Sequence, residues 1–195
     1  MVKLNGKNVI MLKILFLHGF SSCGRGNKSK MLKAYFGESG VIAQNLPYSP
    51  NEAIEMLDKL IVSEKIDLLI GSSLGGFYAT YLAEKHRLKA VLLNPSTEPW
   101  KTLFPYVGMQ KRFCDGEPFN FKKSYIKELK NFKVDPLKGR YLVLLQSDDE
   151  LLDYTKAQSL YNTQHVIVEH GGNHRFENID AYMSMIRKFR TLGTL

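Results

Sequence analysis

The sequence predicts an α/β protein, with a mainly parallel sheet of about six strands and helices on both faces. Short apolar runs alternate with stretches of helical periodicity, and most of the runs end in a polar or glycine-containing loop. Strand–helix–strand units joined in this way are right-handed and give a parallel sheet covered on both sides. One run leads into Gly71-x-Ser73-x-Gly75, a pattern typical of α/β-hydrolases. The length of 195 residues suits a single domain, 1–195, with one core.

Six apolar runs are the expected strands. Runs of this length, bounded by glycine, proline or polar residues, are typical of buried parallel strands. The first ends at His18-Gly19, and the third carries Ser73. The predicted strands cover residues 13–17, 41–46, 66–70, 89–94, 141–146 and 166–169.

Helices are expected between these strands. Gly37 ends the first of them, and Ser49-x-x-Glu52, with Pro50 at the first helical position, forms a capping box at the start of the second. Apolar residues then recur at helical spacing through the other intervals. The predicted helices are centred on residues 31–35, 50–64, 74–87, 154–161 and 179–189.

Residues 95–139 interrupt the alternation, because they contain no clear strand and are rich in aromatic residues and proline. A long connection of this kind in a compact domain is usually functional or an inserted cap. One interpretation is a small lid that supplies apolar walls for an acyl or aryl group, with Trp100 and Phe104 as substrate-binding residues. The other is packing against the edge of the sheet. The sequence leaves both open.

Composition indicates a globular protein with a basic surface. The hydrophobic fraction is 44%, the charged fraction 24%, and the net charge +8. Such a charge permits attraction to a polyanion, but the lysines are scattered, so we expect a solvated surface and no nucleic-acid partner. Cys23 and Cys114 are too few for a disulfide scaffold and lie in no metal-binding spacing. These cysteines therefore indicate no metal site, and a reducing compartment fits.

We expect neither a membrane-spanning segment nor a signal peptide near the amino terminus, and hence a cytoplasmic protein. The apolar stretch 9–17 is interrupted by Lys13, is too short to span a bilayer and lacks a cleavage site. Met11 is an alternative start, which would make residues 1–10 a loose or added leader.

Ser73 is the predicted nucleophile. In a nucleophile elbow the turn strains the backbone at the serine, so the residues two before and two after it have almost no side chain. Only Ser73 satisfies this pattern, because Ile70 stands two residues before Ser72. The alternative is a tight glycine turn with a spectator serine.

The other two catalytic groups are expected in the order acid, then histidine. The acid should follow the fifth strand, where Asp149 is our choice, Asp148 its main competitor and Asp153 a weaker one. The base should follow the last strand, where Gly171-Gly172 would let His174 return over the sheet edge.

The oxyanion hole needs two backbone donors. The N–H of Leu74 follows the nucleophile, and the N–H of Phe20 lies in the loop after the first strand. In the same loop His18 more plausibly orders the backbone than acts as the base.

These stretches together resemble the YqiA-like esterase family, and the resemblance spans nearly the whole chain from Leu15. It rests on Leu-His-Gly-Phe at 17–20, Gly-Ser-Ser-Leu-Gly-Gly at 71–76, and the matching residues at 93–95, 135–137, 149–154 and 171–176. The resemblance implies a single-domain hydrolase without a cofactor that cleaves carboxylic esters or thioesters such as acyl-CoA. It implies Ser73 as nucleophile, Asp149 as acid and His174 as base. The sequence departs from the family at Asp148, where a glycine is usual, and in its basic loop 21–26.

The sequence also permits two other interpretations of function. Gly19-x-x-x-x-Gly24 resembles a P-loop, but Arg25 replaces the required lysine, and Lys28-Ser29 comes three residues late. The same loop, with Arg25 and Lys28, could instead bind a phosphorylated leaving group such as coenzyme A. The alternative outside enzymes is a hydrolase-like module that binds a polyanion or a protein partner. Neither the acyl length nor the oligomeric state is legible in the sequence.

Overall fold

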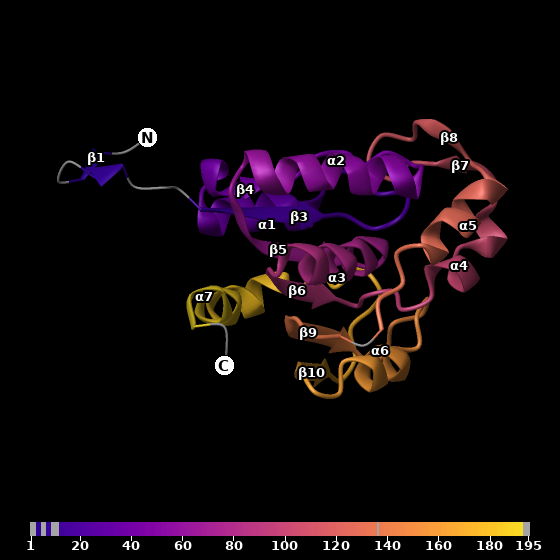
Figure 1. Cartoon of the computed structure of the whole chain (residues 1–195). Helices are drawn as coiled ribbons and strands as arrows, with labels where there is room; N and C mark the ends of the chain where they lie inside the picture. Colours follow the sequence, from indigo (N-terminus) through magenta and orange to yellow (C-terminus); the bar gives the residue numbers. More distant parts are fainter. Residues whose placement is uncertain (1–2, 5–6, 9–11, 136, 193–195) are drawn as a thin grey trace.

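A six-stranded parallel sheet forms the centre of the molecule (Figure 1). The computed structural model describes residues 3–4, 7–8, 12–135 and 137–192. The strand order is β10-β9-β6-β5-β3-β4, and every pairing within this sheet is parallel. The strands are β3 (Lys13–Leu17), β4 (Val41–Ile42), β5 (Ile66–Ser72), β6 (Lys89–Leu93), β9 (Arg140–Gln146) and β10 (His165–Glu169). The predicted fold class is therefore confirmed.

Alternate residues of the strands build two hydrophobic layers. Leu69 points into one layer with α2 (Pro50–Ser63), α3 (Leu74–His86) and α6 (Tyr154–Leu160). Its neighbours Leu68 and Ile70 point into the other, with α1 (Asn27–Phe36) and α7 (Met183–Leu192). All three leucine and isoleucine side chains are fully buried, so the sheet is covered on both faces, as continuous apolar runs predict.

Two elements are shorter or different from the prediction. The strand expected over 41–46 ends at Ile42, because the backbone of Leu46 and the side chain of Asn45 bond to the loop after β3 instead of extending the ladder. A short 3-10 helix, η1 (Glu38–Gly40), precedes it. The closing helix begins as a 3-10 turn, η3 (Ile179–Tyr182), before α7.

The 95–139 insertion is more regular than expected. It contains α4 (Pro99–Thr102), η2 (Phe104–Tyr106), the hairpin of β7 (Gly108–Lys111) and β8 (Pro118–Phe121), and α5 (Lys123–Lys130). The expectation that this segment holds no strand was wrong. One face of the hairpin is apolar, because Phe119 and Phe121 of β8 are buried there. Opposite them, β7 carries glycine and glutamine, so its sequence lacks the alternation of apolar and polar residues that indicates a strand.

The hairpin packs on the loop that follows β3. The ring of Phe20 lies 5.7 Å and 4.9 Å from the rings of Phe119 and Phe121. The N–H of Phe113 donates to the carbonyl of Ser21 at 2.8 Å. The insertion therefore sits at the carboxyl end of the sheet, where the polar loops also lie (Figure 1).

Little of the expected leader 1–10 can be described. Its short strands β1 (Lys3–Leu4) and β2 (Lys7–Asn8) pair in antiparallel fashion, while its remaining positions, and the alternative start Met11, lie outside the described residues. Within the described part of the chain, no helix has the length and apolar character needed to cross a bilayer.

Candidate active site

Ser73 occupies a strained turn between β5 and α3. Its φ of 55° and ψ of −120° lie in a region that residues with side chains rarely adopt. The flanking glycines leave no space for a side chain. A Cβ on Gly75 would lie 2.1 Å from the carbonyl oxygen of Leu17, and one on Gly71 would lie 2.3 Å from that of Gly75. These contacts explain the Gly-x-Ser-x-Gly spacing and hold the hydroxyl at the carboxyl edge of the sheet.

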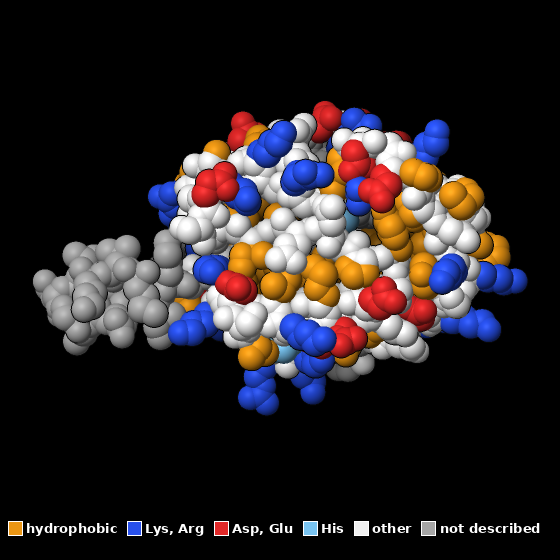
Figure 2. All heavy atoms as spheres, turned by 90° about the horizontal axis from the view of Figure 1, so that it is seen from above, with side chains coloured by type: hydrophobic (Ala, Val, Ile, Leu, Met, Phe, Trp, Pro, Cys, Tyr) orange, Lys and Arg blue, Asp and Glu red, His pale blue; other side chains and the backbone are white. Residues whose placement is uncertain are grey.

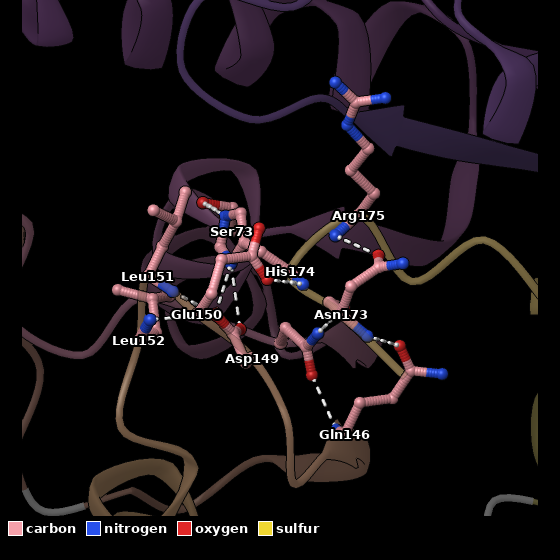
Figure 3. Close-up of polar contacts among 10 residues, drawn as sticks. Ser73, Gln146, Asp149, Glu150, Leu151, Leu152, Asn173, His174 and Arg175 are labelled. Carbon is pink, nitrogen blue, oxygen red and sulfur yellow. Dashed lines mark hydrogen bonds and ion pairs between the residues drawn. The ribbon is translucent and has the colours of Figure 1, made fainter. Parts of the chain in front are cut away.

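His174 faces this hydroxyl from the loop after β10 (Figure 3). Its Nε2 lies 3.0 Å from Ser73 Oγ, across a sequence separation of 101 residues. Gly171 and Gly172 precede it with φ values of 89° and 79°, a conformation that favours glycine. The glycine pair thus turns the chain back toward the elbow.

Asp149 holds the other face of the imidazole. Its Oδ2 and Oδ1 lie 2.8 and 2.9 Å from His174 Nδ1, and Oδ1 also accepts the N–H groups of Leu151 and Leu152. Only 2% of the Asp149 side chain is exposed. A carboxylate at Nδ1 keeps the proton there and leaves Nε2 free to accept the serine proton.

The competing aspartates have other contacts. Asp148 is exposed and accepts a hydrogen bond from its neighbour Ser147 at 2.9 Å. Asp153 caps α6 by accepting the N–H of Thr155 at 3.0 Å. Of the aspartates that follow β9, Asp149 is therefore the one placed against His174.

The two predicted oxyanion donors are the backbone N–H of Leu74, in the elbow, and that of Phe20, in the loop after β3. Leu74 is the first residue of α3, where N–H groups have no partner within the helix. Within the described part of the chain, no protein acceptor is found for the N–H of Leu74 or of Phe20. Both residues line one small hollow, together with Gly19, Tyr48 and Tyr78. Gly19 lies so close to Ser73 that a Cβ there would be 3.1 Å from the serine Cβ.

His18 orders this loop and does not face the serine. It is 7% exposed, and its Nε2 accepts the N–H of Leu46 at 3.0 Å. Its Nδ1 lies 2.8 Å from the carbonyl oxygen of Gly19, so the ring fits as a neutral Nδ1–H tautomer. Burial is the main cause that lowers the pKa of His18 below its ordinary value.

The three further residues proposed to bind substrate do not line the hollow. Arg25 is exposed in the loop after β3. Trp100 is half-buried and packs edge-on against Phe77, with ring centroids 6.1 Å apart. Phe104 is 55% exposed on the insertion, in a stretch whose side chains at 106, 107, 109 and 113 are also exposed and apolar. In Figure 2 hydrophobic side chains gather at the end of the molecule where the hairpin lies.

Two features of the site were not predicted. The carboxylate of Glu150 accepts the backbone N–H of His174 at 2.8 Å, which lowers the pKa of Glu150. Cys23, in the loop that carries Phe20, pairs as a disulfide with Cys114 in the hairpin, their Cα atoms 6.4 Å apart. Sequence spacing could not reveal this pair, because 91 residues separate the two cysteines. No group of three potential metal ligands occurs among the residues that the structure describes.

The parallel sheet and its covering helices are those of the α/β-hydrolase fold class. Solved structures share the architecture at low identity. Alpha/beta hydrolase domain-containing protein 10 from mouse is 16% identical, with a TM-score of 0.73, over 95% of this chain and 91% of that one. The monoacylglycerol lipase of Paleococcus ferrophilus is 16% identical, with a TM-score of 0.69, over 91% and 93%.

Within that class the chain belongs to the family described as "Uncharacterised protein family (UPF0227)", whose model matches residues 13–191. The UPF0227 protein of Citrobacter koseri is 28% identical over 188 residues, which cover 92% of this chain and 99% of that protein. The UPF0227 protein YcfP of Salmonella paratyphi A is 29% identical over 189 residues, with the same coverage. The family resemblance inferred from the sequence is thereby confirmed.

Proposed function

We propose that this protein is a serine hydrolase that cleaves carboxylic esters or thioesters through a covalent acyl-enzyme. The observation that carries the proposal is the unbroken hydrogen-bond chain from Ser73 Oγ through His174 to Asp149, with separations of 3.0 and 2.8 Å. A serine hydroxyl is a weak nucleophile unless a positioned base takes its proton, and this chain supplies one.

The first half-reaction forms the acyl-enzyme. Ser73 Oγ attacks the carbonyl carbon while His174 Nε2 takes the hydroxyl proton, and the buried carboxylate of Asp149 stabilises the imidazolium. The N–H groups of Leu74 and Phe20 are the donors for the oxyanion, since both border the hollow beside the serine. His174 then gives its proton to the departing alcohol or thiol.

The second half-reaction releases the acid. Water enters where the leaving group was, His174 takes one of its protons, and the hydroxide oxygen attacks the acyl carbon. Collapse of the second tetrahedral intermediate returns the proton to Ser73 Oγ. No metal or organic cofactor has a role in either step.

Substrates with an apolar acyl or aryl group fit the surroundings of the site. Phe20 and Tyr78 border the hollow, and the ring of Tyr106, on the insertion, lies 5.8 Å from the ring of Phe20. For thioesters, the exposed guanidinium of Arg25, in the same loop as Phe20, is the group we assign to a phosphorylated leaving group such as coenzyme A. Burial lowers the pKa of Lys28 to about 8, which leaves it mainly cationic at neutral pH, so Lys28 is the second group that we assign to this contact.

Fluorophosphonate labelling read by intact mass tests the activated serine. We expect one adduct on the wild type and none on Ser73→Ala or His174→Ala. An unlabelled wild-type protein that is folded would overturn the proposal. With a labelled wild type, esters and acyl-CoAs are then screened by chain length. Unchanged acyl-CoA kinetics in Arg25→Ala would remove the role given to Arg25.

A further inference from the structure

The backbone of Asn173, the residue before His174, is held by two buried amide side chains from neighbouring strand ends. Asn94, just after β6, donates from Nδ2 to the carbonyl of Asn173 at 3.0 Å. Gln146, the last residue of β9, accepts the N–H of Asn173 on its Oε1 at 3.0 Å (Figure 3). Both backbone polar groups of Asn173 thus bond to residues that are only 3% and 2% exposed.

The side chain of Asn94 is also bonded to the backbone of Gln146. Asn94 Oδ1 accepts the backbone N–H of Gln146 at 2.9 Å, and the backbone N–H of Asn94 donates to the carbonyl of Leu144 at 3.0 Å. The φ of Asn94 is 41°, a conformation that asparagine tolerates better than most residues. Asn94 therefore links the ends of β6 and β9 with the loop that carries the histidine.

The orientation of the Gln146 amide is determined by its other contacts. Its Nε2 donates to Glu169 Oε2 at 2.9 Å and to Asn178 Oδ1 at 2.8 Å. The glutamate in turn accepts from Asn178 Nδ2 and from the Tyr182 hydroxyl. The hydrogen bonds from Gln146, Asn178 and Tyr182 lower the pKa of Glu169. Because the amide nitrogen must face the ionised carboxylate, the amide oxygen faces the N–H of Asn173.

Packing reinforces this arrangement at Gly172. A Cβ on Gly172 would lie 2.2 Å from the side-chain carbon Cδ of Gln146, so the glutamine amide fills the space beneath the loop. The loop is also bonded to β9's extension, with Gly171 N–H on Ser147 Oγ at 2.9 Å. The height of the loop above the sheet is therefore set by the position of Gln146.

We propose that Asn94 and Gln146 are positioning residues. By fixing the backbone of Asn173, they set the distance between His174 Nε2 and Ser73 Oγ. The proposal rests on the proposed function, because the distance they control is the one across which the proton moves. Neither residue touches the triad side chains or the hollow. A displacement of about 1 Å in a catalytic group can cost about 100-fold in rate.

Gln146→Met tests this idea, since methionine keeps the length of the side chain but lacks its amide. The matched control is Gln164→Met. Gln164 makes the same kind of bond at the opposite end of β9, where its Oε1 accepts the N–H of Tyr141 at 3.1 Å. Both variants lose one amide-to-backbone contact of the same strand, but only one of them lies beneath His174.

The readouts are the second-order rate of fluorophosphonate labelling and kcat and KM on a p-nitrophenyl ester. For Gln146→Met we expect labelling and kcat to fall about 10- to 100-fold, with KM within about threefold of the wild type. Gln164→Met should keep both rates, although its melting temperature falls too. A loss in Gln146→Met no greater than that in Gln164→Met overturns the proposal.

Asn94→Asp provides a second test should Gln146→Met fail to fold. Aspartate keeps the acceptor for the Gln146 N–H but places an oxygen against the Asn173 carbonyl, so kcat should again fall while KM stays. Unchanged kcat in folded Asn94→Asp would contradict the role of Asn94. If the wild type itself is not labelled, the proposed function fails. If the wild type and both variants react equally, only the positioning role fails.

Discussion

The strained backbone at Ser73 predicts that glycine should be more stable than alanine at this position. With φ 55° and ψ −120°, a residue that carries a Cβ costs about 1–3 kcal/mol, and glycine is largely relieved of this cost. Glycine loses about 0.5–1 kcal/mol through its greater freedom in the unfolded chain. Ser73→Gly should therefore exceed Ser73→Ala in the free energy of unfolding by about 1 kcal/mol.

Both variants lack the hydroxyl and should be inactive, so their difference reports the backbone alone. A protein of this size gains about 2–4 °C in melting temperature for each kcal/mol, which calorimetry and urea titration both resolve. The control is Ser159, an exposed residue within α6. There the order should reverse, with alanine more stable than glycine by up to about 1 kcal/mol. If alanine is equal or better at Ser73 as well, the strain argument is refuted.

Three further predictions follow from the contacts of individual side chains. Asp149→Asn should lower kcat about 10,000-fold by losing the correct histidine tautomer, and Asp148→Asn should stay within about threefold; equal losses would mean that the acid is misassigned. Because burial lowers the pKa of His18, the unfolded chain binds its proton first, so stability is complete above about pH 6.5 and falls below it. Urea titrations at pH 7.5 and 5.5 should show a smaller loss of stability for His18→Gln than for the wild type. An equal loss in the two proteins would mean that another group causes the pH dependence. Phe104→Ala should raise KM for hydrophobic esters at an unchanged melting temperature, whereas Trp100→Ala should lower the melting temperature; an unchanged KM in Phe104→Ala would count against a substrate-binding insertion.

The sheet and the order of the candidate triad could be predicted because they depend on local patterns. Continuous apolar runs mark buried strands, and parallel strands bring the residues that follow them to one edge. Ser73, Asp149 and His174 follow β5, β9 and β10 in chain order, so topology alone places them near one another. Asp149 was preferred to Asp148 within the loop after the fifth strand, and the family resemblance implies the same residue. The separate contacts of the two side chains provide a physical reason for this preference.

The remaining features depend on contacts between distant segments. The β7–β8 hairpin is stabilised by packing of Phe119 and Phe121 on Phe20, and half of its alternation is absent from the sequence. The pairing of Cys23 with Cys114 depends on the same packing, which brings the hairpin to the loop after β3. Periodicity and spacing carry no information about such contacts.

The roles of Asn94 and Gln146 were hidden for a different reason. In the sequence they are ordinary polar residues at strand ends, where solvent exposure is the usual expectation. Only the sheet order, with β9 between β6 and β10, shows that both lie beneath the histidine loop and are buried there. A buried amide needs partners for its donor and its acceptor. Here those partners include the backbone N–H and C=O of Asn173.

This arrangement separates the chemistry of the site from its specificity. Ser73 and the amides of Asn94 and Gln146 belong to the ends of central strands, whose positions are determined by the core. The hollow beside the serine is lined instead by the loops that follow β3 and β4, and the 95–139 insertion contacts the first of these loops through aromatic packing and the cysteine pair. Substitutions at the strand ends should therefore change kcat, whereas substitutions in the loop and insertion should change KM and the choice of substrate.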